Sequence, residues 1–535
     1  MARLNIALVV TSGHVDAYAR AFCDWALQQP GIALALVDAG DSAPAPSSWR
    51  SRGGRPHRPV LWSGVMLAED VLLRCYKAHR DHSVRLALGE FASTRSLRMC
   101  RLSECLAPGN SASDADLFVL LDDGSAPEAL PPARLGSLAI DYRRNRLSTH
   151  APIGFWDVYH CRPQTGFAIV STRSDGGRTD VLVEGAFRTK YAFLLNQAQL
   201  YWKAQAQLRK LVLDIAASGR LPPARDTVPY SGPCLPPPGS AAALVYLAKI
   251  TGRVLKRAVR RALGIQHRWN LCVTRAGWRD AAFWRGARVS APRGHFWADP
   301  FLHMHQGRTY CFVEDYVYAA QRAHISVLEI TANGVECLGV ALKENFHLSF
   351  PFLFEYQERL YMCPEASESG QVRIYQCDEF PRRWSLHSVA LDNISAADSM
   401  FFEHGGKWWL MTSLDRSGMG DHCSELCLFH AESPLAGAWT PHPQNPLYID
   451  TELGRNAGLI VEGGRIFRAA QRQGFDQYGE GLALFEILVL DEQRYTERKL
   501  TDIEHDYLDR SLGSHHISSK GNITVVDYKM HSFAP

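Results

Sequence analysis

The sequence predicts a multidomain chain: an N-terminal α/β domain with a mainly parallel sheet, followed by a C-terminal all-β five-bladed propeller. Three observations predict this architecture. Apolar runs alternate with helix-like segments in the first part, a proline-rich stretch follows, and a two-strand pattern then recurs five times. The 535 residues also exceed one ordinary domain of about 150 residues. We assign 1–218 to the α/β domain, 219–267 to a linker with a basic helix, and 268–535 to the propeller.

The composition is that of a globular protein and excludes wholesale disorder. Hydrophobic residues make up 46% and charged residues 21% of the chain. The formal net charge of +3 is too small for a protein that binds nucleic acid over its whole surface, so we expect no nucleic-acid partner. The 13 cysteines are odd in number, irregularly spaced and without a CxxC pair, which indicates reduced thiols.

Nothing in the sequence indicates export or a membrane-spanning helix. The N-terminus carries only a short apolar run, and no stretch approaches the ~20 apolar residues that cross a bilayer. We therefore expect a cytoplasmic protein, with a peripheral position at the inner face of the membrane as an option.

The first 216 residues alternate between strand-like and helix-like patterns. Apolar, strand-like runs are 4–10, 32–37, 117–121, 166–171 and 181–183. Helical patterns lie near 14–28, 67–79 and 190–216. Continuous apolar strands that alternate with amphipathic helices are typical of a mainly parallel sheet covered by helices on both faces.

Four segments of this part resemble the formyltransferase domain of methionyl-tRNA and sugar-amine formyltransferases. They are Ser137-Leu-Ala-Ile-Asp141, Ala151-Pro-Ile-Gly-Phe-Trp-Asp157, Thr165-Gly-Phe-Ala and Ser174-Asp175-Gly-Gly. The family's Asn-x-His pair, which polarises the formyl carbonyl, is replaced here by Leu138, Ala139 and Ile140. Asp175 is either the surviving acid or part of a turn. The resemblance thus implies a formyltransferase fold without its catalytic pair, and a folate cofactor only if formyl transfer survives; otherwise we expect no cofactor.

A proline-rich linker leads into a basic amphipathic helix. Seven prolines lie between 221 and 240, which cannot continue a helix. An apolar stripe follows at Leu247, Ile250, Val254, Ala258, Ala262 and Ile265, with Lys249, Arg253, Lys256, Arg257, Arg260 and Arg261 around it. Two interpretations stay open: residues 241–266 contact an anionic membrane surface, or the helix docks between domains with its basic face in solvent.

Five segments of the C-terminal half share a strand, a turn and a second strand. They are 301–310, 352–361, 400–409, 458–467 and 515–524. Their spacing of roughly fifty residues is the length of one four-stranded propeller blade. Because innermost strands line the central funnel, equivalent positions should converge there. Eleven residues before the end of each segment stand Asp299, Phe350, Asp398, Asn456 and Gly513, and four residues after it Glu314, Glu365, Ser413, Gln471 and Tyr528.

Phe296-Trp-Ala-Asp299-Pro-Phe resembles the first-blade signature of five-bladed propellers of the arabinanase, β-xylosidase and invertase type. Further strings are similar to the N-terminal domain of plant glucosamine inositolphosphorylceramide transferase and its bacterial relatives. They include His347-Leu-Ser-Phe-Pro-Phe, Tyr361-Met-Cys-Pro-Glu365, Ala397-Asp398-Ser, Arg455-Asn-Ala-Gly458, Arg468-Ala-Ala-Gln471 and Tyr478-Gly. The hydrolase resemblance implies that Asp299 is a general base and Asp398 an acid that orients it and adjusts its pKa. An alternative for each is a structural role at a turn.

The chain departs from the hydrolases in the fourth blade. Where they place an acidic Glu, it has Arg455 and Asn456, and an arginine clamps phosphate or carboxylate rather than giving up a proton. Glu365 is a candidate third catalytic acid, with a buried ion pair as its alternative. Our candidate substrate-binding residues are His347, Ser349, Arg455, Asn456, Arg468, Gln471, Tyr478, His515 and His516. His515 and His516 alone do not make a zinc site, so no metal is predicted.

Together these features favour a carbohydrate-active enzyme, with an active site in the propeller funnel. The preferred hypothesis is a glycosyltransferase that uses a nucleotide sugar and a glycan or glycolipid acceptor in the synthesis of surface glycans. The alternatives are a hydrolase-like enzyme, an N-formyltransferase acting on a nucleotide-linked amino sugar, and a glycan-binding protein without catalysis.

Overall fold

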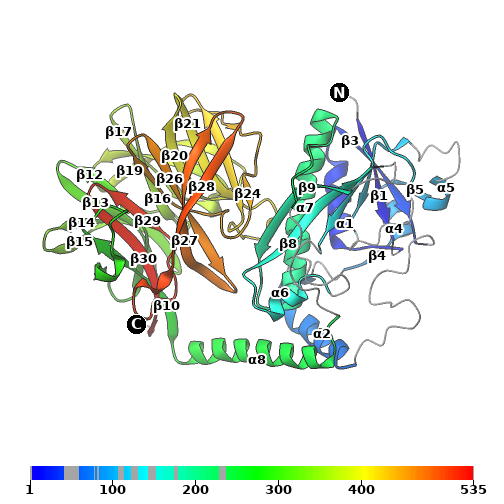
Figure 1. Cartoon of the computed structure of the whole chain (residues 1–535), viewed down its shortest axis with the longest axis horizontal. Helices are drawn as coiled ribbons and strands as arrows, with labels where there is room; N and C mark the ends of the chain where they lie inside the picture. Colours follow the sequence, from blue (N-terminus) through cyan, green and yellow to red (C-terminus); the bar gives the residue numbers. More distant parts are fainter. Residues whose placement is uncertain are drawn as a thin grey trace. The chain divides into compact units, whose positions relative to one another are not determined.

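The computed structural model describes residues 3–11, 13–40, 60–76, 79–80, 84–105, 114–121, 130–142, 152–173, 179–227 and 237–533. The chain divides into two compact units, Met1–Arg253 and Val254–Pro535. Each unit is described by itself below (Figure 1).

The first unit is built on a seven-stranded sheet in the order β5-β3-β1-β6-β7-β8-β9. Its strands are β1 (Leu4–Val10), β3 (Ile32–Asp38), β5 (Arg98–Arg101), β6 (Leu117–Leu120), β7 (Ser137–Asp141), β8 (Gln164–Thr172) and β9 (Thr179–Arg188). The pairs from β5 to β7 are parallel, whereas β7-β8 and β8-β9 are antiparallel. The mainly parallel sheet is therefore confirmed, and all five predicted strands lie in it.

Helices cover this sheet, and the predicted helices near 14–28 and 190–216 are present with shifted ends. They are α1 (Ala17–Leu27), α2 (Val60–Leu73), α4 (Leu88–Thr94), α5 (Leu102–Cys105), α6 (Phe155–Tyr159) and α7 (Phe193–Ser218). Asp16 caps α1, because its Oδ1 accepts a hydrogen bond of 2.8 Å from the amide of Ala19. The preceding His14–Val15 is instead a short strand, β2, paired with β4 (Leu86–Ala87). The segment predicted near 67–79 begins earlier, as α2.

The proposed formyltransferase likeness is not confirmed by this sheet. Leu138, Ala139 and Ile140 lie on β7, between a parallel and an antiparallel neighbour. Asp175, the proposed surviving acid, lies outside the described residues. The basic helix is confirmed as α8 (Ser240–Ala262). Among the described helices, none is long and apolar enough to cross a membrane.

The second unit contains the five predicted blades, each a separate antiparallel sheet (Figure 1). The first blade holds β12 (His295–His305), β13 (Arg308–Val317), β14 (Arg322–Thr331) and β15 (Gly334–Leu342). The second holds β16 (Ser349–Tyr356), β17 (Arg359–Glu365), β18 (Gln371–Glu379) and β19 (Arg383–Asp392). The third holds β20 (Ala396–His404), β21 (Lys407–Leu414), β22 (Glu425–Ala431), β23 (Thr440–Pro441) and β24 (Tyr448–Ile449). The fourth holds β25 (Asn456–Glu462), β26 (Arg465–Gly474), β27 (Gln477–Leu490) and β28 (Tyr495–Ile503).

The fifth blade joins the two ends of the propeller. It contains β10 (Ile265–Thr274) and β11 (Ala287–Val289) from the beginning of the unit, and β29 (Ile517–Lys520) and β30 (Ile523–Phe533) from its end. β10 pairs with β30 along its whole length, from Ile265 opposite Phe533 to Thr274 opposite Thr524. Ten pairs of residues, one from each strand, therefore hold the ring closed.

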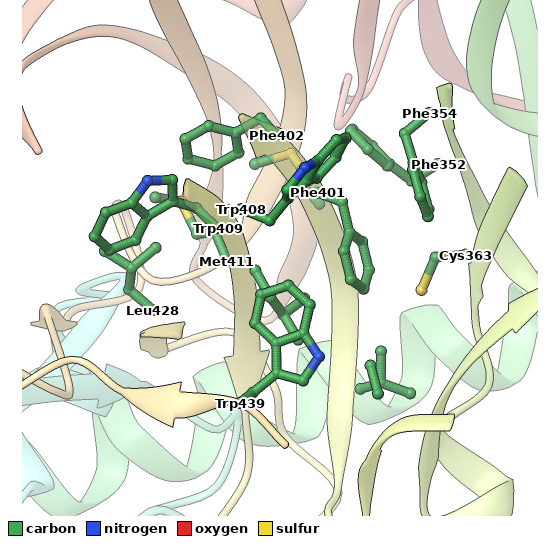
Figure 2. Close-up of a cluster of buried hydrophobic side chains, with 14 of the residues drawn as sticks. Phe352, Phe354, Cys363, Phe401, Phe402, Trp408, Trp409, Met411, Leu428 and Trp439 are labelled. Carbon is green, nitrogen blue, oxygen red and sulfur yellow. The ribbon is translucent and has the colours of Figure 1, made fainter. Parts of the chain in front are cut away.

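The five repeated segments of the sequence are the hairpins of the two innermost strands of each blade. The innermost strands β12, β16, β20, β25 and β29 contact one another in that order, and β29 contacts β12 again. This closed series of contacts confirms the five-bladed ring. Large apolar side chains fill the space between the second and third blades (Figure 2). The cluster includes Phe352, Phe354, Cys363, Phe401, Phe402, Trp408, Trp409, Met411, Leu428 and Trp439.

Candidate active site at the propeller axis

A β-bulge interrupts the innermost strand in four of the blades, at the same place each time. The register shifts between Ala298 and Phe301, between Ser349 and Phe352, between Ala397 and Met400, and between Asn456 and Gly458. In the first three blades the bulged residue has a positive φ: 48° at Asp299, 45° at Phe350 and 52° at Asp398. Bulges re-aim side chains, and strained backbone of this kind gathers at functional sites. The bulges thus define the place at which the predicted acids lie.

One cluster at this level joins the first and fifth blades. His515 Nδ1 lies 2.5 Å from Asp527 Oδ2, and its Nε2 lies 3.6 Å from Asp299 Oδ1. Asp527 also accepts hydrogen bonds from the amides of His515 (2.8 Å), His516 (3.0 Å) and Asp299 (3.2 Å). The His515 ring stacks on Trp269 with a centroid separation of 3.9 Å. Asp527, Asp299 and the Trp269 ring therefore hold the His515 ring in position.

The ionisation of this cluster follows from burial and mutual charge. Burial raises the pKa of Asp299 to about 7, and His515 only partly opposes this effect. For His515, burial favours the neutral ring, but Asp527 and Asp299 outweigh it and raise the pKa. For Asp527 the charge of His515 and its hydrogen bonds outweigh burial, so the pKa is lowered. At neutral pH Asp527 and His515 form an ion pair, and Asp299 is poised to take or release a proton.

A second cluster joins the second, third and fourth blades. Arg455 Nε donates to Asp398 Oδ2 at 2.6 Å, and Nη2 donates to Asp398 Oδ1 at 3.2 Å and to Glu365 Oε2 at 3.1 Å. Burial raises the pKa of Asp398 well above its usual range, whereas Arg455 offsets burial at Glu365 and lowers its pKa. One guanidinium balances one negative charge, so the pair favours a protonated Asp398 beside an ionised Glu365.

Other predicted binding residues lie beside these clusters. The Tyr478 ring lies 5.2 Å from the Arg455 guanidinium and 5.4 Å from the His515 ring. His347 Nε2 faces Glu314 Oε1 at 3.4 Å, and its Nδ1 accepts a hydrogen bond from the amide of Ala323. Ser349 pairs with Glu365 across β16 and β17.

Four predicted binding residues have internal partners instead. Arg468 is fully buried and paired with Glu497 at 2.5 and 2.8 Å. The Asn456 side chain donates to the carbonyls of Asp398 and Met411, and Gln471 accepts a hydrogen bond from Gln473. The buried His516 ring packs against Phe301 and Phe350, and burial lowers its pKa to about 3. These contacts give Arg468 and Gln471 structural roles within the fourth blade, and Asn456 and His516 structural roles between blades.

The predicted register of the fifth blade is wrong by one residue. The hairpin there pairs Lys520 with Ile523, just as His305 pairs with Arg308 in the first blade. Gly513, which bridges to Lys529, therefore corresponds to Ala298, and Lys529 rather than Tyr528 corresponds to Glu314. A one-residue slip moves each side chain to the other face of a strand. Tyr528 accordingly lies in an apolar cluster, whereas Lys529 Nζ donates to the carbonyl of Tyr478 at 2.6 Å.

Asp527 was not among the residues that the sequence singled out. In the corrected register it occupies the position held by Phe312, Cys363, Met411 and Ala469 in the other blades. A charged residue at a position that is apolar in the four other repeats is the signal that could have revealed it.

Asp299, His515 and Asp527 are also chemically suited to a cation. One ligand atom of each lies within 4.8 Å of the others, and all three residues are buried. A cation there would compete with the proton of His515 for Asp527, whose oxygen already lies 2.5 Å from Nδ1. The present geometry is explained by the ion pair alone.

The fold and site define a five-bladed propeller with carboxylates and one arginine at its axis. Residues 286–511 match the family model of the N-terminal domain of glucosamine inositolphosphorylceramide transferase 1. The rice (Oryza sativa subsp. japonica) protein of that name is 35% identical over 209 residues, which are 38% of this chain and 28% of the rice protein. The Arabidopsis thaliana protein is also 35% identical over 209 residues, 38% of this chain and 27% of the relative. The predicted resemblance to this domain is confirmed, over little more than a quarter of the length of these relatives.

Solved structures with some likeness include the catalytic domain of a Coprinopsis cinerea α-L-arabinofuranosidase. It is 12% identical, covers 49% of this chain and 96% of its own, and has a TM-score of 0.36. The Bacillus subtilis arabinanase Arb43A is 14% identical over 35% of this chain and 72% of its own, with a TM-score of 0.28. The five-bladed architecture rests on the strands described above and not on these scores.

Proposed function

We propose that the chain is a glycosyltransferase that joins a sugar from a nucleotide-activated donor to a glycan or glycolipid acceptor, with its active site at the propeller axis. The observation that carries this proposal is that three carboxyls from three blades converge at the propeller axis. Asp299 lies in the cluster of His515, and Glu365 and Asp398 lie in the cluster of Arg455. The sequence match supports transfer over hydrolysis, because the matched relatives are named as glucosamine inositolphosphorylceramide transferases.

The proton chemistry of the proposed reaction follows from the two clusters. Asp299, with a pKa of about 7, serves as the base that takes the proton of the acceptor hydroxyl. The His515–Asp527 ion pair holds Asp299 in place; His515 limits the rise of the Asp299 pKa, whereas Asp527 adds to it. The negative charge of the Asp398–Glu365 pair lies beside the sugar, where positive charge develops as the bond between the anomeric carbon and the donor phosphate breaks. The proton held by this pair passes to the phosphate oxygen that leaves with the nucleotide.

Arg455, predicted to bind a phosphate or a carboxylate, holds two carboxyl groups in the structure. Its guanidinium contacts Asp398 and Glu365, so a donor phosphate would have to displace one of them. We infer that Arg455 holds the carboxyl pair in position before the donor binds, and that release of one carboxylate accompanies binding.

The experiment compares the full-length wild type with Asp299→Asn and Asp398→Asn, using a panel of nucleotide sugars and a glycolipid acceptor. Removing a positioned acid or base typically costs 10²–10⁴-fold in rate, so we expect a loss of about a hundredfold or more in kcat. Asp509→Asn is the matched control, because that side chain is 83% exposed. If the Asp299→Asn variant has the kcat of the wild type, Asp299 is not the base.

A second candidate is a glycan-binding protein without catalysis, favoured by the ion pairing of Asp398 and Glu365 with Arg455 in a buried site. The same panel separates the two. Binding of a sugar with neither transfer to the acceptor nor release of free sugar would favour this candidate, and release of free sugar alone would indicate a hydrolase.

A further inference from the structure

Helix α8 turns its basic side toward the protein and its apolar side toward solvent. Tyr246 is buried, and its hydroxyl donates to Glu69 Oε2 at 2.6 Å. On the same side, Lys249 Nζ donates to the carbonyl of Tyr159 at 2.7 Å and Arg253 Nη1 to that of Tyr191 at 2.9 Å. Arg257 continues this side and forms an ion pair with Asp476. These four positions follow one another at intervals of three or four residues, which places them on one face of a helix.

The opposite face is apolar and uncovered. Residues two positions away along a helix lie about 200° apart, so Leu244 and Tyr246 point in opposite directions. The exposed apolar side chains are Leu244 (53%), Val245 (42%), Leu247 (39%), Val254 (52%), Leu255 (61%), Val259 (46%) and Leu263 (59%). Among the residues of α8 only Ala243 and Tyr246 are buried. An isolated exposed leucine is ordinary, but an apolar strip that runs from Leu244 to Leu263 marks a contact surface.

The charges beside the strip decide which partner fits it. Residues 240–263 contain Lys249, Arg253, Lys256, Arg257, Arg260 and Arg261, and no aspartate or glutamate. Exposed Lys256 and Arg261 lie near the two edges of the apolar strip. A second copy of this helix would bring like charges together, whereas an anionic lipid surface complements them.

We propose that α8 lies flat on an anionic membrane surface, with its apolar strip in the boundary between headgroups and acyl chains. Lys256 and Arg261 reach outward from the edges of the strip to lipid phosphates. The side of the helix that bears Tyr246 and Arg253 stays on the protein. This membrane contact does not depend on the proposed enzymatic activity.

A second helix of the first unit supports this assignment. α2 contacts α8 through the Glu69–Tyr246 hydrogen bond, and Leu73 and Ile250 belong to one apolar cluster. It also exposes large apolar side chains, at Val60 (89%), Leu67 (64%), Val71 (55%) and Leu72 (74%). Two neighbouring helices with uncovered apolar residues are expected where a protein rests on a lipid phase.

The test is a vesicle co-sedimentation titration with the full-length chain. Vesicles contain either phosphatidylcholine alone or phosphatidylcholine with an equal amount of phosphatidylglycerol. We expect binding to the mixed vesicles that weakens with salt, and much weaker binding to the neutral ones. The variant Leu255→Ser/Val259→Ser should bind about tenfold less tightly or worse, because each apolar side chain withdrawn from lipid forfeits its transfer free energy. Lys256→Gln and Arg261→Gln should each weaken binding about fivefold, and only to the anionic vesicles.

The matched control is Leu386→Ser/Leu488→Ser, which removes two leucines exposed by 47% and 51% on propeller strands. It should bind like the wild type. Thermal unfolding that is unchanged in each variant shows that the fold is intact. The proposal is overturned if the wild type ignores anionic vesicles, or if the α8 and control variants lose binding equally. It is also overturned if light scattering shows a dimer that the α8 variant dissociates while vesicle binding is unaffected.

Discussion

The replacement Asp299→Asn should change the pH dependence of stability, independently of any substrate. The folded carboxyl keeps its proton up to about pH 7, whereas an ordinary unfolded aspartate releases it near 3.8. Between these values the native state therefore binds more protons than the unfolded state, and the contribution of Asp299 to stability falls as pH rises. Asn does not titrate, so the variant escapes this loss.

The expected size follows from the pKa. One pKa unit corresponds to about 1.4 kcal/mol, so the two units between pH 5 and 7 amount to roughly 3 kcal/mol. The free energy of unfolding of Asp299→Asn minus that of the wild type should thus grow by about this amount between pH 5 and pH 8. The Phe350 amide that donates to Asp299 Oδ2 can still donate to the amide oxygen of Asn, which limits other effects.

The assay is urea unfolding followed by tryptophan fluorescence at several pH values. Asp509→Asn, at an exposed position, serves as the control and should show no such trend. A difference between Asp299→Asn and the wild type that is the same at pH 5 and pH 8 would show that the carboxyl titrates normally. Asp299 would then lack the raised pKa on which its proposed role as the base depends.

Three further predictions concern buried contacts of the propeller. Arg455→Met leaves the carboxyls of Asp398 and Glu365 without their cation and should lower the free energy of unfolding by about 3–5 kcal/mol, measured by denaturant titration at pH 7. Arg468→Met leaves the buried carboxylate of Glu497 without its cation and should also lower the free energy of unfolding by about 3–5 kcal/mol. Sugar binding, measured by calorimetry, should be unchanged, because Arg468 contacts neither axial cluster. Gly458→Ala should destabilise by about 1–3 kcal/mol or more, since a Cβ there would meet the carbonyl oxygen of Ile517 at 2.1 Å. Gly463 also has a positive φ, 58° against 130° at Gly458, but its surroundings are open, so Gly463→Ala should cost less in the same thermal melt.

The repeated hairpins could be predicted from sequence because the signal is local. A turn flanked by two apolar strands recurs at a fixed spacing, and in four blades an aromatic residue at its end sets the alignment. The fifth repeat ends in Thr524, so that marker is missing and the alignment slipped by one residue. The turn between Lys520 and Ile523, which the sequence alone did not fix, sets the true register.

The contacts of the site were less predictable than its location. The structure brings Asp398, Glu365 and Arg455 together, as equivalent positions in a ring require. The sequence left open whether Glu365 is a catalytic acid or part of a buried ion pair, and it did not identify Arg455 as the partner. It also did not indicate that Arg468 turns away toward Glu497 on β28, because strand pairing within a blade decides which face a side chain takes.

Closure of the ring by β10 and β30 has a consequence for biosynthesis. β10 leaves the ribosome some 250 residues before its partner, and β30 also carries Asp527. Until β30 has been synthesised, the opening strand of the propeller has an unpaired edge, and His515 lacks its partner Asp527. Pairing at such long range is slow, and it exposes the nascent chain to aggregation and to chaperones. A chain released before β30 would thus have most of its blades, but neither the strand that closes the ring nor the Asp527 that pairs with His515.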